Sequence, residues 1–170
     1  MLNHKSNIVL IGMPGSGKST IGVILAKLTS KNFVDTDVII QTLQGRSLQD
    51  IVDKEGHVAL LQIEQDVLRN LRFENYVIAT GGSAVYSHTA MEHLKESSLI
   101  IFLNVDLPVL EKRIANFPGR GLVKRPDQTL ADLFTERFFL YNEYADITIE
   151  CGSLTHDEVC RRIIMQTGCR

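Results

Sequence analysis

Residues 12–20 place glycines, a lysine and two hydroxyl residues at the spacing of a phosphate-binding loop. The stretch reads Gly-Met-Pro-Gly-Ser-Gly-Lys-Ser-Thr. It matches the pattern of a glycine, any four residues, and then Gly-Lys-Ser, at Gly12, Gly17, Lys18 and Ser19. The glycines allow successive backbone N–H groups to converge on phosphate oxygens. Lys18 supplies a mobile positive charge for the terminal phosphates, and the Ser19 hydroxyl can bind Mg²⁺. The stretch therefore predicts a site for ATP with Mg²⁺; the alternative is a turn that binds nothing, in which Lys18 has no packing purpose.

The sequence around this loop is also what a phosphate site needs. The apolar run Ile8–Ile11 predicts a buried strand before the loop, and apolar residues at helical spacing follow it. The start of the following helix adds the positive end of its dipole. The predicted nucleotide-binding residues of this segment are Gly12, Gly15, Ser16, Gly17, Lys18, Ser19 and Thr20.

Two aspartates follow the next short strand, predicted at 32–35. Asp35 and Asp37 are two residues apart, a spacing that points both carboxylates to one side of an extended chain. One could hold a water on Mg²⁺ while the other accepts the proton of a substrate hydroxyl. The spacing alone leaves open which aspartate has which role. Either aspartate could instead be a helix N-cap.

Basic residues occur in a segment rich in proline and glycine, at about 116–128. Arg120 in this segment is the candidate lid arginine, which would close over bound nucleotide and stabilise the transferring phosphoryl group. Lys124 and Arg125 could serve instead, or be solvated surface charges. Arg137, next to Phe138 and Phe139, is either a partly buried anion receptor or part of a structural salt bridge.

Helical patterns alternate with five short apolar runs along the chain. The runs lie at 8–11, 32–35, 76–79, 99–103 and 147–149, and helices are expected at about 37–43, 58–72, 107–115 and 129–144. Ser47 with Asp50 and Thr155 with Glu158 predict helix starts. This alternation predicts a doubly wound, five-stranded parallel sheet. Ligands bind at the carboxyl ends of such strands, where the phosphate loop, Asp35 to Asp37, and Gly81-Gly82 should converge.

Size and composition limit the classes of protein to be considered. The 170 residues suit one domain spanning 1–170, and the net charge of −2 argues against a nucleic-acid-binding surface. No apolar run approaches the length of a membrane span, and no signal peptide of the usual form is visible. The three cysteines, all after residue 150, are expected to be reduced thiols in a cytoplasmic protein. We expect a monomer. No Asn-Lys-x-Asp motif is present, which counts against a GTPase.

The motifs together resemble the shikimate kinase family, nearly from end to end. The match comprises the phosphate loop, 33–37 (Phe-Val-Asp-Thr-Asp), 45–51 (Gly-Arg-Ser-Leu-x-x-Ile), Gly56, Glu64, 78–82 (Ile-Ala-Thr-Gly-Gly), Arg137 with Tyr141, and Ala145-Asp146. The resemblance implies a P-loop NTPase fold, a three-layer α/β sandwich with a mobile lid. It also implies ATP-dependent phosphorylation of a hydroxyl of shikimate, a small molecule, to give shikimate 3-phosphate.

The resemblance also implies roles for individual residues. Asp37 would bind the substrate hydroxyls, Asp35 would lie in the Mg²⁺ shell, and Arg113 would stack on adenine through its planar guanidinium. Arg120 would be the lid arginine, and Arg137 one of two arginines that bind the carboxylate of shikimate. The acceptor-binding region would lie at about 37–72, with acceptor-binding residues Asp37, Leu61, Glu64, Gly81, Gly82 and Arg137.

The chain departs from the family pattern in the acceptor half. The family's Gly-Glu-x-x-Phe-Arg-x-x-Glu is Gly56-His-Val-Ala-Leu-Leu-Gln-Ile-Glu64, so Leu61 stands where the second carboxylate-binding arginine is expected. An apolar residue cannot replace such a charge-assisted contact, whose loss costs roughly 1.5–3 kcal/mol. Glu64, which the family pairs with that arginine, would turn to Arg137 or bind substrate itself. The usual third glycine of the second loop is Ser83, and the lid reads Arg120-Gly-Leu-Val in place of Arg-Pro-Leu-Leu.

Two other functions remain open at this point. A kinase of the same family could act on a different small hydroxylated acceptor, one without a carboxylate. Alternatively, the chain could bind a nucleotide without turnover. The presence of Lys18, Ser19, Asp35, Asp37 and Arg120 argues against the second of these, because a retired site has no chemical reason to keep both carboxylates and the lid charge.

Overall fold

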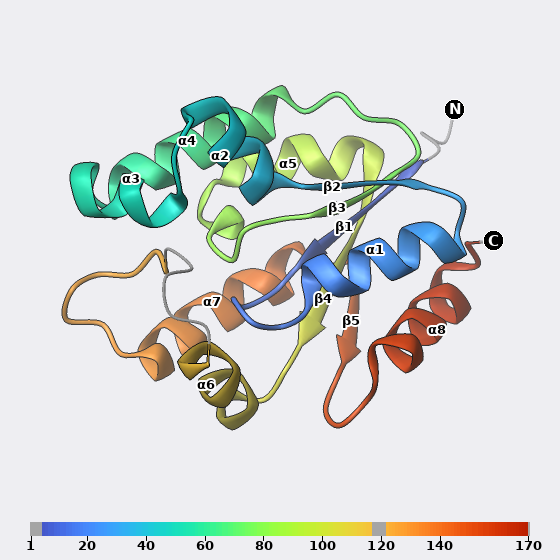
Figure 1. Ribbon diagram of the computed structural model, residues 1–170. Helices are drawn as coiled ribbons and strands as arrows, with labels where there is room; N and C mark the ends of the chain where they lie inside the picture. Colours follow the sequence, from blue (N-terminus) through green and yellow to red (C-terminus); the bar gives the residue numbers. More distant parts are fainter. Residues whose placement is uncertain (1–4, 117–121, 170) are drawn as a thin grey trace.

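The five apolar runs form one parallel sheet, with strand order β2-β3-β1-β4-β5 (Figure 1). The computed structural model describes residues 5–116 and 122–169. The strands are β1 (Asn7–Ile11), β2 (Asn32–Asp35), β3 (Tyr76–Ala79), β4 (Ser98–Asn104) and β5 (Ile147–Glu150). All four strand pairings are parallel, as the alternation of strands and helices predicts. Strand β1 is in the centre and is buried along its whole length, which explains its uninterrupted apolar sequence.

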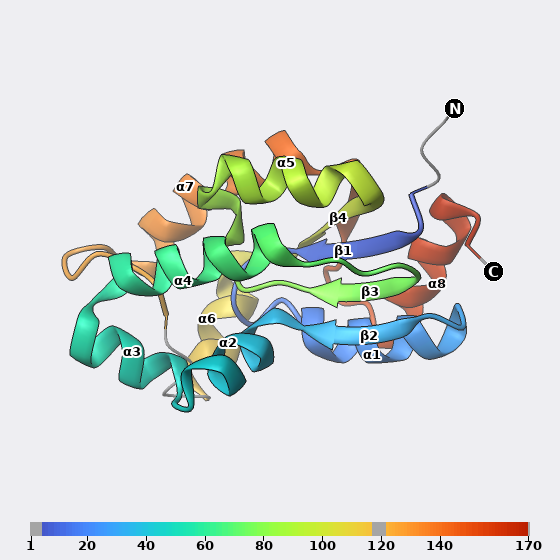
Figure 2. The same ribbon diagram turned by 90° about the horizontal axis from the view of Figure 1, so that it is seen from above.

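Helices connect the strands and cover both faces of the sheet (Figures 1 and 2). Helices α1 and α8 contact each other on one face of the sheet, whereas α5 and α7 lie against β4 on the opposite face. Helix α4 packs beside α5. The helices are α1 (Lys18–Leu28), α2 (Thr36–Gln44), α3 (Leu48–Glu55), α4 (His57–Asn70), α5 (His88–Ser97), α6 (Leu107–Ala115), α7 (Leu130–Tyr144) and α8 (His156–Thr167).

Several helix starts are set by the side chains that the sequence indicated. Ser47 and Asp50 form a reciprocal capping box at α3, and Thr155 and Glu158 form another at α8. Thr129, which the sequence pattern placed inside a helix, is instead the N-cap of α7. Because capping satisfies backbone N–H groups that have no partner within the helix, these residues fix where each helix begins.

One helix is absent from the sequence-based prediction. The segment between the second glycine loop and β4 contains a short 3₁₀ helix, η1 (Ala84–Tyr86), and then α5. The Ser87 hydroxyl accepts a hydrogen bond from the backbone N–H of Ala90 and so caps α5. The helix buries only a narrow apolar stripe, formed by Ala90, Met91 and Leu94, which gives a weak periodic signal.

A second, smaller hydrophobic cluster lies apart from the main core. It joins α2, α3 and α4 through buried Ile40, Leu48, Ile51 and Leu60, and it also includes Val123 from the segment between α6 and α7. Leu61 packs partly buried against this cluster. The three helices of the predicted acceptor-binding region therefore have a small hydrophobic cluster of their own. The phosphate loop, in contrast, is attached to β1 of the main sheet. Within the described residues, no helix is long and apolar enough to cross a membrane.

Candidate active site

The phosphate loop connects β1 to α1 in a conformation that requires glycine. Gly17, at the N-cap of α1, has φ +95°, a left-handed conformation that other residues rarely adopt. The Ser16 N–H donates to the Met13 carbonyl at 3.1 Å and closes the turn. Gly17 and the first three residues of α1 line the cavity described below, and the start of a helix favours an anion there.

The ammonium of Lys18 is buried against this loop. Its Nζ donates to the carbonyl of Gly12 at 2.7 Å and to that of Met13 at 2.9 Å. Burial lowers the pKa of Lys18 to about 8, although the nearby carboxylate of Asp37 acts in the opposite direction. The loop thus holds a desolvated cation beside the start of α1, where a polyphosphate could replace the carbonyl contacts with stronger charge-assisted ones.

Ser19 and Asp35 meet at the edge of the same loop. The Ser19 hydroxyl donates to Asp35 Oδ2 at 2.5 Å. Asp35 Oδ1 accepts a hydrogen bond from the backbone N–H of Asp37 at 2.9 Å, so Asp35 also caps α2. Asp35 can therefore cap α2 with one oxygen and take part in a metal site with the other. A hydroxyl and a carboxylate oxygen are ligands that Mg²⁺ accepts, directly or through water, alongside substrate phosphates.

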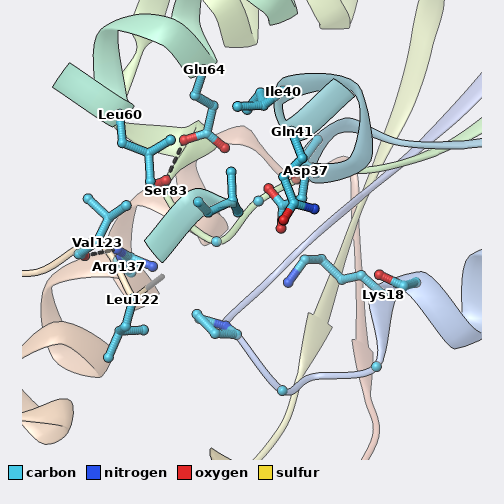
Figure 3. A pocket seen from close by; sticks show the side chains of 18 of the residues that line it. Lys18, Asp37, Ile40, Gln41, Leu60, Glu64, Ser83, Leu122, Val123 and Arg137 are labelled. Atoms are coloured by element: carbon cyan, nitrogen blue, oxygen red, sulfur yellow. Dashed lines mark hydrogen bonds between the residues drawn. The ribbon is translucent and has the colours of Figure 1, made fainter. Parts of the chain in front are cut away.

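Two acidic side chains approach Gly81 in the loop after β3. A Cβ at Gly81 would lie less than 3 Å from Glu64 Oε1 and from Asp37 Oδ1, so any larger residue there would displace one or both carboxyls. Figure 3 shows Asp37 and Glu64 pointing into one cavity, together with Lys18. Asp37 comes from the first turn of α2 and Glu64 from the middle of α4.

Glu64 is buried, with 2% of its surface exposed, and its hydrogen bond is to Ser83. The Ser83 hydroxyl donates to Glu64 Oε2. The other oxygen, Oε1, is buried without a hydrogen-bond partner among the described residues. Burial raises the pKa of Glu64 to about 7, and the hydrogen bond from Ser83 opposes this rise. The structure therefore corrects the expectation that Glu64 turns to Arg137, because its partner is Ser83.

Arg137 lies on the inner face of α7 and is 1% exposed. Its Nη2 donates to the carbonyl of Val123 at 2.5 Å, and its Nε donates to the Tyr86 hydroxyl at 3.3 Å. The Tyr86 hydroxyl in turn donates to Glu136 Oε1. A Cβ at Gly82 would lie 2.8 Å from Arg137 Nη1, which places the second glycine directly against the guanidinium.

Arg113 lies beside the phosphate loop. It is on α6, and its Nη1 donates to the carbonyl of Gly15 at 2.9 Å. Arg120, the candidate lid arginine, falls in 117–121, outside the described residues. Leu122 and Val123, which follow it, line the cavity.

One cavity of about 700 Å³ brings most of these residues together. It contains the predicted Gly15, Gly17, Lys18, Ser19, Thr20, Asp37, Glu64, Gly81, Gly82, Arg113 and Arg137. Gly12 and Ser16 are not among its lining residues but contact Lys18 from below, through the Gly12 carbonyl and the Ser16 hydroxyl. Further lining residues to which the sequence analysis gave no binding role include Ile40, Gln41, Leu48, Leu60, Thr80, Ser83, Leu122, Val123 and His156.

Leu61 lines a different, smaller cavity of about 160 Å³. Glu64 and Ser83 separate this cavity from the larger one, since both residues line both cavities. The apolar residues that line the acceptor half could not be recognised in the sequence, because their pattern is the same as that of ordinary hydrophobic core residues. Thr80 and Ser83 could have been found from their place at the end of β3.

Comparison with known proteins gives the family. The shikimate kinase family model matches residues 14–167 of this chain. The chain belongs to the shikimate kinase family. Curated shikimate kinases include that of Caldanaerobacter subterraneus subsp. tengcongensis, 34% identical over 93% of this chain and 94% of the relative, and that of Rippkaea orientalis, 42% identical over 84% of this chain and 77% of the relative.

Solved structures of shikimate kinases have the same fold. The shikimate kinase from Acinetobacter baumannii in complex with shikimate is 30% identical, with a TM-score of 0.85 over 98% of this chain and 95% of that one. The enzyme from Aquifex aeolicus is also 30% identical, with a TM-score of 0.80 over 95% of this chain and 96% of that one. The family membership makes this chain a phosphotransferase that acts on a hydroxyl group, and the family uses ATP with Mg²⁺.

The residues present fit that cofactor set. Lys18 lies at the start of α1 with its ammonium on the loop carbonyls, and Ser19 and Asp35 already place two oxygen ligands side by side. Among the described residues, no group of three or more His, Cys, Asp or Glu side chains could hold a metal ion. This donor set suits Mg²⁺, which takes few protein ligands and is completed by phosphate oxygens and water.

Proposed function

We propose that this chain transfers the terminal phosphoryl group of ATP to a hydroxyl of shikimate and yields shikimate 3-phosphate. One observation carries the proposal: Lys18 and Ser19 line the same cavity as Asp37 and Arg137. A nucleotide site and a site for a hydroxylated acid are thus open to each other. The Acinetobacter baumannii relative, whose structure contains shikimate, supports this choice of acceptor.

In the nucleotide half, the loop residues 12–20 would bind the phosphates. Lys18 would stabilise charge on the transferring group, while Ser19 would bind Mg²⁺ directly and Asp35 through water. Arg113 would lie against adenine, and Arg120 would close the site from the lid at about 116–128. Charge stabilisation in a site that excludes water is the main contribution that a protein makes to phosphoryl transfer.

In the acceptor half, Asp37 would bind the reacting hydroxyl and accept its proton. Its position in the first turn of α2, fixed by the cap at Asp35, places the carboxylate between the phosphate loop and Gly81. Arg137 would bind the acceptor carboxylate, which could replace the Val123 carbonyl as partner of its guanidinium. Gly81 and Gly82 would let the acceptor approach the backbone closely.

A second candidate function is the same reaction on another small hydroxylated acceptor, one without a carboxylate. The observation that favours it concerns Leu61, which stands where the family has an arginine and lines the smaller cavity. Among the described lining residues of the acceptor half, Arg137 is therefore the one arginine. A carboxylate bound by one guanidinium instead of two would be recognised about tenfold or more less tightly.

ADP release with Mg-ATP and a panel of acceptors tests both candidates. We expect release with shikimate that Asp37→Ala or Lys18→Met reduces by at least about a hundredfold, since each removes a group that acts on the transferring phosphoryl or the attacking hydroxyl. Release with a neutral polyol but not with shikimate would select the second candidate. ATP binding without release on any acceptor would leave only a nucleotide-binding module.

We propose further that the protein acts as a monomer in the cytoplasm. The three cysteines Cys151, Cys160 and Cys169 are free thiols, as is usual for a protein in a reducing compartment. Size-exclusion chromatography with light scattering tests the monomer, and a larger particle at micromolar concentration would contradict it.

A further inference from the structure

Ser83 and Glu64 form a buried pair at the boundary between the two cavities. Ser83 follows the glycines after β3 and is 6% exposed, and Glu64 projects from α4. The hydroxyl of Ser83 donates to Glu64 Oε2, as the dashed line in Figure 3 shows. A hydrogen bond to a buried carboxyl fixes the direction in which its second oxygen points, because the group is planar.

The second oxygen of this carboxyl is left for a ligand. Glu64 Oε1 is buried and has no hydrogen-bond partner among the described residues. It lies within 3 Å of the Cβ position of Gly81, and Asp37 Oδ1 lies within 3 Å of the same point. A buried acceptor without a partner costs about 1–3 kcal/mol, so such an atom in the wall of a cavity indicates where a bound molecule supplies a donor.

The cations of the site are engaged elsewhere. Arg137 donates to Val123 and Tyr86, and Lys18 donates to the phosphate loop. Leu61, one helical turn before Glu64, carries no donor. Ser83 is therefore the side chain that orients Glu64.

Resting on the proposed function, we propose that Ser83 is a positioning residue that determines acceptor specificity. Its hydroxyl holds Glu64 so that Oε1 accepts a hydrogen bond from the acceptor hydroxyl adjacent to the one that reacts at Asp37. The site is thus built for an acceptor with two hydroxyls on neighbouring carbons. In shikimate, the hydroxyl next to the one phosphorylated is that on carbon 4.

The test compares shikimate with its 4-deoxy and 5-deoxy analogues by calorimetric binding and by ADP release. The variants are Ser83→Ala, which removes the hydroxyl, and Ser83→Thr, which keeps it. Thr29→Val is the matched control, because the Thr29 hydroxyl is also buried but donates to the Leu25 carbonyl away from both cavities. Urea unfolding of each variant confirms that it is folded.

We expect wild-type protein to bind 4-deoxyshikimate about tenfold more weakly than shikimate, the loss typical of one hydrogen bond to a charged group. In Ser83→Ala, the KM for shikimate should rise about tenfold with kcat little changed, and the preference over the 4-deoxy analogue should nearly vanish. Ser83→Thr should restore both. The preference over the 5-deoxy analogue should be the same in all proteins.

Two results overturn the inference: a 4-hydroxyl preference that survives in folded Ser83→Ala, or one that is lost equally in Thr29→Val. Either can occur while the wild-type protein phosphorylates shikimate, so the inference can fail alone. A wild-type protein that neither binds nor phosphorylates shikimate overturns the proposed function and this inference with it.

Discussion

The Ser19 hydroxyl donates to Asp35 Oδ2 at 2.5 Å, and this bond joins the first turn of α1 to the end of β2. The other oxygen of Asp35 caps α2 through the N–H of Asp37. One carboxylate therefore sets the distance between the proposed Mg²⁺ ligands and the proposed catalytic aspartate. The nucleotide and acceptor halves of the cavity are coupled through Asp35.

Substitutions at Asp35 should separate its two roles. Asp35→Asn keeps an oxygen for the cap but removes the charge, so we expect the Mg²⁺ concentration for half-maximal activity to rise about tenfold with little change in stability. Asp35→Ala should show the same Mg²⁺ effect and, in addition, lose about 1 kcal/mol of unfolding free energy through the lost cap. Mg²⁺ titrations of ADP release and urea unfolding measure the two effects. An unchanged Mg²⁺ requirement in Asp35→Asn would exclude the metal role.

Gly81→Ala should abolish acceptor binding but not nucleotide binding. The new methyl group would overlap Glu64 Oε1 and Asp37 Oδ1 and displace one or both of these carboxyls from their positions in the acceptor half. We expect at least about a hundredfold loss of kcat/KM for the acceptor, while the Kd for ATP changes less than about threefold. Gly45→Ala is the control for a glycine substitution without overlap: a Cβ there would meet nothing within 4 Å, and its cost is the strain of a left-handed φ of +63° away from the cavity. Equal losses of ATP and acceptor binding would show that the substitution merely disrupts the fold.

The sheet and the nucleotide half could be predicted because their signals are local. The bounds of β2, β3 and α6 are those that the sequence indicated, since each is set by an apolar run or a proline in the first helical turn. The phosphate loop combines a strict spacing with a strand before it and a helix after it. Convergence of the strand ends follows from parallel topology, and the common cavity confirms it for Lys18, Asp37, Gly81 and Gly82.

The acceptor half could be predicted only in part, because its contacts connect distant elements. The replaced residues Leu61 and Ser83 were visible in the sequence, but the bond between Ser83 and Glu64 depends on how α4 packs beside the loop after β3. The contact of Arg137 with the Val123 carbonyl likewise depends on the path of the segment between α6 and α7. Helix α5 was missed because its buried stripe is narrow and its exposed residues are charged or polar.

Leu61→Arg should improve the use of shikimate. An arginine at this position could extend along the smaller cavity, which Leu61, Glu64 and Ser83 line together, and bring a guanidinium toward the acceptor half. We expect the KM for shikimate to fall about tenfold, the gain typical of a charge-assisted contact. Asn70→Arg adds the same charge at an exposed position on α4 and should leave the KM unchanged. If Leu61→Arg folds and its KM for shikimate equals that of the wild type, the pocket is built for another acceptor.

The buried carboxyl of Glu64 should make the protein less stable as the pH rises toward neutral. Burial raises the pKa of Glu64 from 4.5 to about 7, so between these values the folded protein keeps a proton that the unfolded chain has released. The unfolding free energy therefore falls across this window, by about 3 kcal/mol in total, and the loss is complete above pH 7. Glu64→Gln keeps the shape and an oxygen for Ser83 but does not titrate.

The quantity to measure is the unfolding free energy of Glu64→Gln minus that of the wild type, from urea unfolding at each pH. We expect this difference to rise by about 3 kcal/mol between pH 4.5 and pH 7.5. The difference cancels the titration of groups that the Glu64 charge does not influence. Lys18 is not one of them, because the Glu64 charge helps to raise its pKa, so its titration near pH 8 contributes at the upper end of the range. Shikimate should reduce the difference at pH 7.5, because a hydroxyl at Oε1 stabilises the charged carboxylate. Parallel stability curves for the two proteins would mean that Glu64 is ionised throughout, and that water or a cation already solvates its second oxygen.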